Sequence, residues 1–394
     1  MVLLNSRWLL PDHMADSLPT QARQIEETRR ALLDAANRYG FELVMPPLVE
    51  HLDSLLIGVS GSTGGTLDLQ TFKLVDQLSG RSLGVRADTT PQVARIDAHL
   101  LNRQGLTRLC YCGPVLHTRQ ATPHASREPL QFGAEIYGHA GLEADLEIIE
   151  LAVQSLQIGV AQAGLIDLSD VRIVTALMEA YPVDGALQTR VYEALAAKDD
   201  PALREMDMLP ESLRAGLLSL LTLYGDVQVL TTARAALPPL PAIHLALDSL
   251  QWLRDHLVAG GVSPNSIRFD LSDLGGYGYY TAMRFAVYSA SSKDALARGG
   301  RYDEVGAVFG RKRPAVGFSL DVKVLVDAAP PNAPRSAIRA PWSNDASLSL
   351  AVRSLRDRGE TVICALPGHE SEADEFACDR ELVQVQGQWV VKSF

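Results

Sequence analysis

The stretch GPVLHTRQATPHASREPLQFGAEIYG, residues 113–138, decides how the rest of this 394-residue chain is interpreted. It opens with a Gly-Pro pair, carries two histidines in its first half, and ends in a largely apolar run that holds Gln131 and Glu135. His117 and His124 do not predict a histidine-based catalyst, because no nucleophile and orienting acid stand at motif spacing from them. The stretch therefore offers polar groups suited to binding and no recognisable catalytic set.

In its length and its Gly-Pro opening, the stretch resembles the second signature motif of histidyl-tRNA synthetases, class II enzymes that activate histidine with ATP. Both versions span the same number of residues, so they correspond position by position without gaps. The resemblance implies that the arginine that clamps the ATP α-phosphate falls on His117 and that a second phosphate-side arginine falls on Ala125. The substrate-side positions, Gln131 and Glu135, match the family pattern.

A second matching segment is TFKLVDQLSGRSLGVRADTTPQVAR, residues 71–95. It predicts two strands around a turn at Ser79-Gly80, followed by a helix that begins within Thr89–Pro91. By resemblance, Asp88 stands where the synthetase uses a glutamate to hold the ligand's α-amino group. Thr90 matches the threonine that supports the same group.

The histidine-specific motif of the synthetases has its counterpart in LGGYGYYTAMRFAVY, residues 274–288. The resemblance places Tyr279 and Tyr280 on the tyrosine pair that packs against the imidazole of the substrate. The arginine that opens this motif, near the reacting carboxylate, is replaced by Gly275.

Two further segments extend the likeness, ALARGGRYDEV at residues 295–305 and PAVGFSLDVKVL at residues 314–325. The first keeps glycines where a backbone must pass close under a ligand. The second is close to the third class II motif, whose arginine covers the ATP, and that position is Val324. Arg86 corresponds to another family arginine, for which a structural ion pair and a ligand contact are both open.

The changed positions share one chemistry. Adenylation needs cations around the α-phosphate, because negative charge develops on its oxygens and guanidinium groups that reach two oxygens at once stabilise it. Removal of one such preorganised donor typically costs a factor of about 10² to 10³ in rate. The family arginines are absent at four positions: His117, Ala125, Gly275 and Val324. The pattern predicts a chain that has lost aminoacylation chemistry and has no catalytic residue.

The matching positions suit an amino-acid pocket, and they are Asp88, Thr90, Gln131, Glu135, Tyr279 and Tyr280. Free histidine presents an ammonium group, a carboxylate and an imidazole, for which acids, an amide and tyrosines are fitting partners. Burial of two carboxylates without a cationic partner is costly, which favours a cationic ligand. The alternative is a relic core in which these polar groups satisfy one another.

The N-terminal region predicts a long helix followed by a dimer-forming segment. Ser17 can cap the helix, apolar residues recur at helical spacing from Ala22 to Tyr39, and Gly40 is the expected stop. In class II synthetases, a pair like Pro46-Pro47 ends the segment that forms the dimer. The likeness implies a homodimer and an α+β fold, in which a class II synthetase-like antiparallel sheet is flanked by helices.

The domain pattern separates a class II synthetase-like core, residues 1–329, from an abbreviated C-terminal α/β module, residues 335–394. The core carries an Ala- and Leu-rich helical insertion at about residues 167–261, and prolines form a linker before the module. In the module, a helix over 345–358 and a hairpin over 382–392 are expected. The module is shorter than the synthetase anticodon domain and shows no basic stripe, so no tRNA partner is expected.

Composition limits which other functions and locations are expected for the chain. Hydrophobic residues make up 47% and charged residues 21% of the chain, and the formal net charge of −11 disfavours general nucleic-acid affinity. No run approaches the roughly 18 apolar residues of a membrane span. The chain start lacks a signal-peptide layout, so a cytoplasmic protein without membrane partners is expected.

No metal and no cofactor is expected. The cysteines are few, and the pair Cys110 and Cys112 in a predicted strand has no second ligand cluster to complete a metal site. The glycine-rich residues 58–65 lack the ending and the strand-to-helix context of a phosphate loop, and they are interpreted as a loop beside the pocket.

A chain similar to histidyl-tRNA synthetases over roughly residues 5–326, without the ATP arginines and the full anticodon domain, resembles the regulatory subunits of ATP phosphoribosyltransferase. In that family, a synthetase-like subunit assembles with a short catalytic subunit that joins ATP to phosphoribosyl pyrophosphate, the first step of histidine biosynthesis. The resemblance implies a catalytic partner subunit, a requirement for the chain in activity, and feedback inhibition with histidine as effector.

Two other functions stay open. A truncated histidine-activating synthetase or amino-acid ligase with a rearranged ATP site would catalyse histidine-dependent exchange of pyrophosphate into ATP. A free-standing amino-acid sensor or RNA-binding relic would not co-purify with a catalytic phosphoribosyltransferase subunit.

Overall fold

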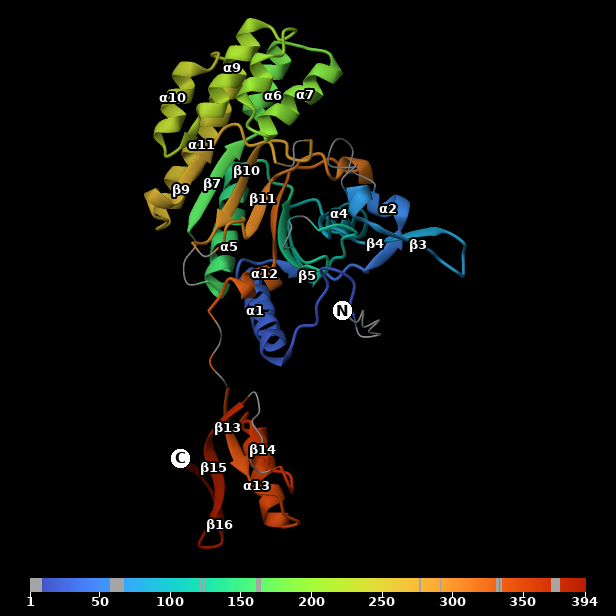
Figure 1. Ribbon diagram of the computed structural model, residues 1–394, viewed down its shortest axis with the longest axis vertical. Coiled ribbons are helices and arrows are strands. Elements are labelled where there is room, and N and C mark those ends of the chain that lie inside the picture. The colour runs from blue at the N-terminus through green and yellow to red at the C-terminus, as the bar shows by residue number, and fades with distance from the viewer. Residues whose placement is uncertain are drawn as a thin grey trace, which may run out of the picture. The chain divides into compact units, whose positions relative to one another are not determined.

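The computed structural model describes residues 9–56, 67–120, 122, 125–160, 164–275, 278–290, 292–330, 333, 335–369 and 376–394. The chain divides into two compact units (Figure 1). The larger unit holds residues up to Asp16 and Ile25–Ala329, and the smaller holds Ser17–Gln24 and Pro330–Phe394.

A nine-stranded sheet forms the framework of the larger unit, in the order β1-β5-β6-β12-β11-β10-β7-β9-β8. Its strands are β1 (Glu42–Leu43), β5 (Thr107–Pro114), β6 (Leu130–Tyr137), β7 (Leu165–Asp170), β8 (Tyr224–Gly225), β9 (Ile267–Asp270), β10 (Met283–Tyr288), β11 (Ala297–Arg301) and β12 (Ala315–Asp321). Neighbouring strands are antiparallel except for β1 with β5 and β7 with β9. The expectation of an α+β fold around an antiparallel sheet is confirmed.

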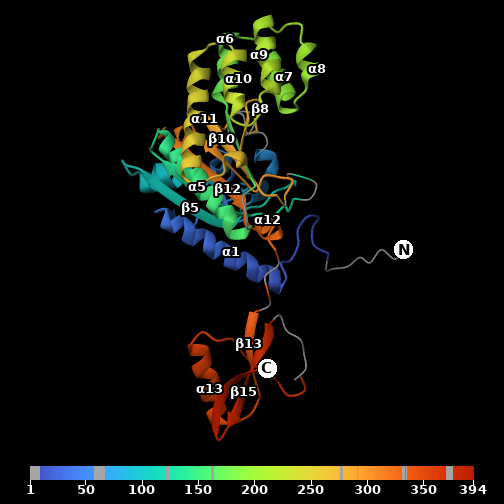
Figure 2. The same ribbon diagram turned by 90° about the vertical axis from the view of Figure 1, so that its left-hand side faces the viewer.

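The two faces of this sheet have different roles, because side chains alternate along each strand. In β6, Phe132, Ala134 and Ile136 enter the main hydrophobic core, whereas Gly133 and Glu135 lie on the opposite face. The core side is covered by α1 (Pro19–Arg38), α5 (Leu142–Gly159) and α12 (Val322–Asp327). Figure 2 shows α1 and α5 lying across the same side of the sheet.

The first helix ends as expected at Gly40. The Phe41 amide donates to the Ala36 carbonyl and the Gly40 amide donates to the Asn37 carbonyl, the hydrogen-bond pair of a Schellman motif, with Gly40 at φ +82°. The expected cap at Ser17 is wrong, because α1 begins at Pro19. Leu18 therefore stands at the N-cap position, and Ser17 lies one residue before it.

A small sheet and a short helix bring the second matching segment, residues 71–95, to the face of the large sheet that carries Glu135, called the open face below. The sheet has the order β2-β4-β3, with β2 (Val49–His51), β3 (Phe72–Val75) and β4 (Ser82–Val85). Gly80 at φ +70° lies in the turn between β3 and β4, which confirms the predicted hairpin. The helices around it are α2 (Leu52–Leu56), α4 (Thr90–Arg95) and the π-helix η1 (Ile96–Leu101). The glycine-rich residues 58–65 lie outside the described part of the chain.

The insertion is a bundle of helices that follows the carboxyl end of strand β7 (Figure 1). It contains α6 (Arg172–Ala180), α7 (Gly185–Ala196), α8 (Asp200–Arg204), α9 (Glu211–Thr222), α10 (Gln228–Ala236) and α11 (Pro241–Ala259). Buried leucines such as Leu213, Leu217, Leu247 and Leu250 fill its interior. Two short 3-10 turns, η2 (Pro264–Ser266) and η3 (Ala307–Phe309), complete the unit. None of the helices in the described ranges is long and apolar enough to cross a membrane.

In its described C-terminal part, the smaller unit contains a four-stranded sheet in the order β14-β13-β15-β16 and the helix α13. Its elements are β13 (Arg335–Ala340), α13 (Ala346–Asp357), β14 (Val362–Cys364), β15 (Phe376–Val385) and β16 (Gln388–Ser393). Asp345 caps α13 by accepting the Ser347 amide, and Gly359 follows the helix at φ +85°. The expected helix and hairpin are present, and the hairpin begins earlier than predicted.

Candidate functional site

Five of the six residues predicted for an amino-acid pocket line one small cavity on the open face of the sheet. These are Asp88, Thr90, Glu135, Tyr279 and Tyr280, and the cavity volume is about 70 Å³. The sixth, Gln131, is joined to them because its Nε2 donates to Asp88 Oδ1 at 2.8 Å. Residues from the loop after β4, from β6 and from the segment before β10 therefore meet at one place.

Hydrogen bonds order the acidic side of this cavity. Asp88 Oδ1 also accepts from the Thr90 amide at 3.1 Å, and Gln131 Oε1 accepts from the Thr89 amide at 2.9 Å. Thr90 Oγ1 and the Tyr111 hydroxyl each lie 3.2 Å from Glu135 Oε1 and donate to it. The groups thus hold one another in place, as the relic-core alternative requires, but they do not use all their hydrogen-bonding atoms.

Glu135 is the least satisfied of these groups. It is only 1% exposed, and its Oε2 has no hydrogen-bond partner among the residues that the structure describes. Burial, followed by the nearby Asp88 carboxylate, raises the pKa of Glu135 well above its usual range. A carboxyl group held neutral in this way can ionise when a cationic ligand arrives.

Tyrosines form the other wall. The rings of Tyr279 and Tyr302 are stacked with centroids 5.0 Å apart, and Tyr280 meets Tyr279 edge to face at 5.3 Å. The hydroxyls of Tyr279 and Tyr302 are buried without a partner within the described ranges. Burial, then the charges of Asp88 and Glu135, raises the pKa of Tyr279 well above its usual range, so its hydroxyl remains a donor. The wall can contact an aromatic ring by stacking and by hydrogen bonds.

A larger cavity of about 540 Å³ adjoins the first, and the two share Arg298 and Ser319 in their walls. Three of the positions where the family pattern has ATP arginines line it: His117, Ala125 and Val324. Its acidic residues are Asp294, Asp321 and Asp327, and Arg298 is the one arginine among the described lining residues. This charge balance repels a triphosphate.

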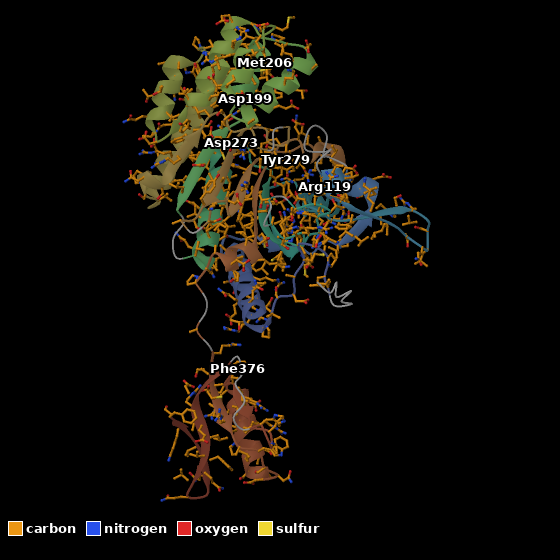
Figure 3. All side chains as sticks on the ribbon, viewed as in Figure 1. Arg119, Asp199, Met206, Asp273, Tyr279 and Phe376 are labelled. Atoms are coloured by element: carbon orange, nitrogen blue, oxygen red, sulfur yellow. The ribbon has the colours of Figure 1, made fainter. Side chains whose placement is uncertain are left out.

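The fourth changed position, Gly275, lies beside a different arginine. An ideal Cβ on Gly275 would lie 2.8 Å from Arg284 Nη2. Arg284 is only 5% exposed, forms an ion pair with Asp273, and places its guanidinium carbon 5.6 Å from the centroid of the Tyr280 ring. Figure 3 labels Asp273 and Tyr279, which lie in the segment between β9 and β10.

Other polar side chains of the matching motifs serve the framework. Arg86 donates to the carbonyls of Pro114 and Pro46 at 2.8 and 2.9 Å, so its role is structural, through backbone carbonyls instead of an ion pair. His117 Nε2 donates to the Ala87 carbonyl at 2.8 Å. Arg301, buried under α5, donates to Asp145 Oδ1 at 3.1 Å. His124 lies outside the described part of the chain.

Four lining or supporting residues were not predicted as part of the site. Tyr111 stands between two cysteines in an apolar strand, and only its register opposite Gly133 brings its hydroxyl to Glu135. Tyr302, Arg298 and Ser319 lie in motifs that were recognised, but their sheet face follows from strand pairing. Sequence motifs alone do not state which side chains face the cavity.

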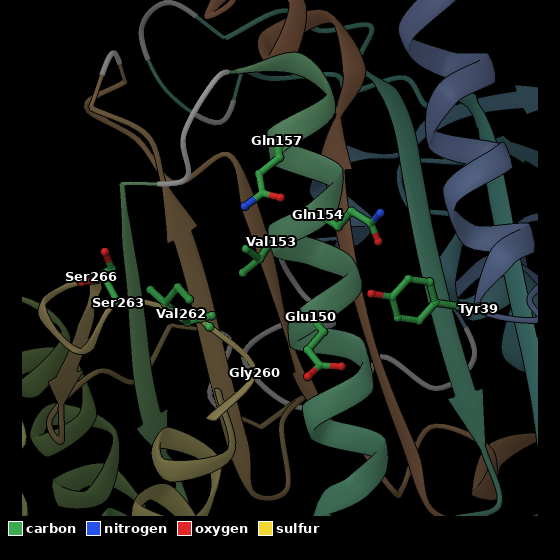
Figure 4. A pocket seen from close by; sticks show the side chains of 11 residues that line it. Tyr39, Glu150, Val153, Gln154, Gln157, Gly260, Val262, Ser263 and Ser266 are labelled. Atoms are coloured by element: carbon green, nitrogen blue, oxygen red, sulfur yellow. The ribbon is translucent and has the colours of Figure 1, made fainter. Parts of the chain in front are cut away.

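A cavity of about 660 Å³ lies elsewhere, on the outer side of α5 (Figure 4). Figure 4 shows Glu150, Gln154 and Gln157 on α5, with Tyr39 on one side of the helix and Val262 on the other. This place lies over the core side of the sheet and collects none of the motif residues, so it is not the candidate site.

The described cysteines do not lie in a group of residues that could bind a metal ion. Burial raises the pKa of the Cys110 thiol to about 11 and that of the Cys112 thiol to about 12. In the ranges that the structure covers, no group of three or more His, Cys, Asp or Glu residues could hold a metal ion.

Known families match both parts of the chain. The profile described as Histidyl-tRNA synthetase matches residues 13–325, and the profile described as ATP phosphoribosyltransferase subunit HisZ C-terminal domain matches residues 335–392. The ATP phosphoribosyltransferase regulatory subunit of Albidiferax ferrireducens is 63% identical over 389 residues, covering 98% of this chain and 100% of the relative. This chain belongs to the ATP phosphoribosyltransferase regulatory subunit family. The regulatory subunit of Verminephrobacter eiseniae is 59% identical, with the same coverage of 98% and 100%.

Solved structures agree with membership in the regulatory subunit family. A Bacillus halodurans protein described as an ATP phosphoribosyltransferase regulatory subunit/histidyl-tRNA synthetase matches with a TM-score of 0.80 at 26% identity, covering 92% of this chain and 94% of its own. The histidyl-tRNA synthetase of Nostoc sp. PCC 7120 matches with a TM-score of 0.78 at 18% identity, covering 98% and 97%. The second likeness shows the class II synthetase fold alone.

Proposed function

We propose that this chain is a non-catalytic subunit that assembles with the short catalytic ATP phosphoribosyltransferase, is required for its activity, and carries feedback inhibition by histidine in the first step of histidine biosynthesis. Histidine is the effector, and it binds in the cavity lined by Asp88, Thr90, Glu135, Tyr279 and Tyr280. Family membership supports the assembly, and the geometry of the cavity supports the ligand.

The observation that carries the ligand assignment is the set of unused polar atoms around this one cavity. Glu135 Oε2 and the hydroxyls of Tyr279 and Tyr302 are buried and lack partners in the described chain. Buried polar atoms are rarely left unpaired in folded proteins, so such a cluster favours a polar ligand. An acid beside aromatic hydroxyls fits an imidazole or ammonium group, because each supplies N–H donors or a positive charge.

The larger cavity supports loss of adenylation. A histidine-activating enzyme would hold ATP next to the amino acid, yet the adjoining cavity presents three aspartates and one arginine. A transition state with negative charge on phosphoryl oxygens gains little there. The isolated chain is therefore expected to catalyse no histidine-dependent exchange of pyrophosphate into ATP, and measurable exchange would establish the synthetase or ligase alternative instead.

We also propose that the chain works as a cytoplasmic homodimer with a core of residues 1–329 and a separate module of residues 335–394, and that it does not bind tRNA. The edge strand β1 supports the dimer, because Leu43 in this strand and Met45, two residues after its end, are 49% and 77% exposed. Exposed apolar side chains on an unpaired strand edge favour association with another surface.

The assembly is tested by co-purification. A tagged short catalytic phosphoribosyltransferase subunit should retain this chain on an affinity column. Addition of this chain to the catalytic subunit should increase the ATP phosphoribosyltransferase activity. Passage of the chain through the column, together with an unchanged rate, would show that the chain is not its regulatory subunit.

A further inference from the structure

Strand register places Arg298 at the junction of the two cavities. In β11, Arg298 lies opposite Ser319 of β12 and Ala286 of β10. Gly300, two residues further, lies opposite Gly317, which in turn pairs with Glu135 of β6. Because residues two apart share a sheet face, Arg298 and Glu135 project from the same face of the sheet.

Arg298 is the cation of this site. Among the lining residues that the structure describes, it is the sole arginine or lysine of either cavity, and it lines both. Burial raises the pKa of Tyr280 to about 12, and of the two arginines that act against this rise, Arg284 has the larger effect and Arg298 the smaller. Arg298 lines the small cavity together with Tyr279, Tyr280 and Tyr302.

Arg298 is exposed, and the described protein supplies no carboxylate to neutralise its charge. Its hydrogen bond from Nη1 to the Ala295 carbonyl is long, at 3.4 Å. No carboxylate forms an ion pair with it anywhere in the described chain. The neighbouring arginines differ, because Arg284 pairs with Asp273 and Arg301 pairs with Asp145.

The small cavity therefore presents carboxyl groups on one side and a guanidinium group on another. Asp88 and Glu135 supply the carboxyl groups, and Arg298, which also lines the larger cavity, supplies the guanidinium group. An amino acid is a zwitterion and needs both. In the synthetase pattern, the carboxylate side belongs to the arginine position that is Gly275 here. The arginine beside Gly275, Arg284, forms an ion pair with Asp273 and is not among the described residues that line either cavity.

We propose that Arg298 binds the α-carboxylate of the histidine ligand, replacing the arginine missing at position 275. This inference rests on the proposed histidine site. A guanidinium can hold two carboxylate oxygens at once, which fixes the orientation of the ligand as well as its affinity. Arg298 thereby sets the preference of the site for a free amino acid over its decarboxylated or reduced analogues.

The test compares two ligands that differ only at the carboxylate. Isothermal titration calorimetry measures the binding of L-histidine and of L-histidinol, in which an alcohol replaces the carboxylate, to the full chain. The wild-type chain should bind histidine at least about 10-fold more tightly than histidinol, since a hydrogen-bonded charge pair is lost. Arg298→Ala should abolish this preference by weakening histidine alone, and Arg298→Lys should restore part of it.

Lys293→Gln is the matched control, because Lys293 is exposed in the loop that precedes β11 and its replacement removes one positive charge, as Arg298→Ala does. It should leave both affinities unchanged. A thermal melt of each variant shows whether the fold is intact.

Three results would overturn the inference. If Arg298→Ala keeps the histidine-to-histidinol ratio while Glu135→Gln weakens both ligands, the histidine site stands and only the role of Arg298 is wrong. Equal weakening of both ligands by Arg298→Ala would likewise show that Arg298 does not hold the carboxylate. If the wild-type chain binds neither ligand, both the proposed histidine site and the proposed role of Arg298 are wrong.

Discussion

The carboxylate of Glu135 lies directly over Gly317, so that a methyl group on Gly317 would come 1.5 Å from Glu135 Oε2. The two residues face each other across β6 and β12. Any side chain at this position of β12 would occupy the place of the carboxylate. The missing side chain of Gly317 therefore creates the room in which Glu135 can meet a ligand.

Gly317→Ala should push the Glu135 carboxylate out of its position. We expect a loss of about 1–3 kcal/mol in the free energy of unfolding, as for other overpacked sites, and a fall of at least about 10-fold in histidine affinity, because a charged hydrogen bond is displaced. Urea unfolding and calorimetric titration measure the two effects. Gly185→Ala is the control, since a Cβ there meets nothing within 4 Å, and histidine affinity equal in both variants would contradict this account.

Glu135→Gln should change how stability depends on pH. The folded-state pKa of Glu135 is raised by burial above the value of the unfolded chain, which is roughly 4.3. The folded state then holds the proton more tightly, so stability is highest below the unfolded pKa and falls as pH rises toward the folded pKa. The glutamine variant lacks this titration and should gain stability relative to wild type as pH rises above the unfolded pKa of roughly 4.3. Parallel curves of unfolding free energy against pH would show that Glu135 is not held neutral.

Arg301→Ala should destabilise the core without touching the ligand. It leaves the buried Asp145 carboxylate of α5 without its partner, which typically costs about 3–5 kcal/mol. Asp145→Asn added to Arg301→Ala should recover part of the loss, because no uncompensated charge remains. Chemical denaturation measures the free energy of unfolding of the two single variants and of the double variant. If the double variant loses as much free energy of unfolding as the two single variants together, Arg301 and Asp145 are not a coupled pair.

Replacement of Leu43 and Met45 by aspartate should separate the proposed homodimer. Charges at this edge of β1 oppose the burial of its apolar side chains. Light scattering coupled to size-exclusion chromatography should give the mass of two chains for wild type and of one chain for the double variant. Met208→Asp, an equally exposed position at 80% in the insertion, should stay dimeric. A monomeric wild type would contradict the proposal.

Local signals predicted much of the fold. Gly40 ends the first helix because a positive φ is needed there, and Ser79-Gly80 supplies the turn of a hairpin. These features depend on a few neighbouring residues, so they are visible in sequence. The cap predicted at Ser17 was wrong because the helix begins two residues later, at Pro19.

The site was visible in part. Resemblance named Asp88 and Glu135, which lie far apart in sequence and now line one cavity. Tyr111 and Arg298 were not named, because their place depends on which residues of distant strands face each other. A shift of one residue in that register would turn each side chain to the other face of the sheet, and local sequence does not set it.

The central claim is that histidine controls the assembled complex from the cavity that holds Asp88 and Glu135. The most direct measurement is the histidine inhibition curve of ATP phosphoribosyltransferase reconstituted from the catalytic subunit and this chain. The experiment compares four forms of this chain: the wild type, Asp88→Asn, Glu135→Gln and the exposed control Glu193→Gln. The account predicts that half-inhibition by the two cavity variants needs at least about 10-fold more histidine, as expected for loss of a charged contact, whereas the control follows the wild type. Superimposable inhibition curves for all four proteins would contradict it and would place the histidine site elsewhere.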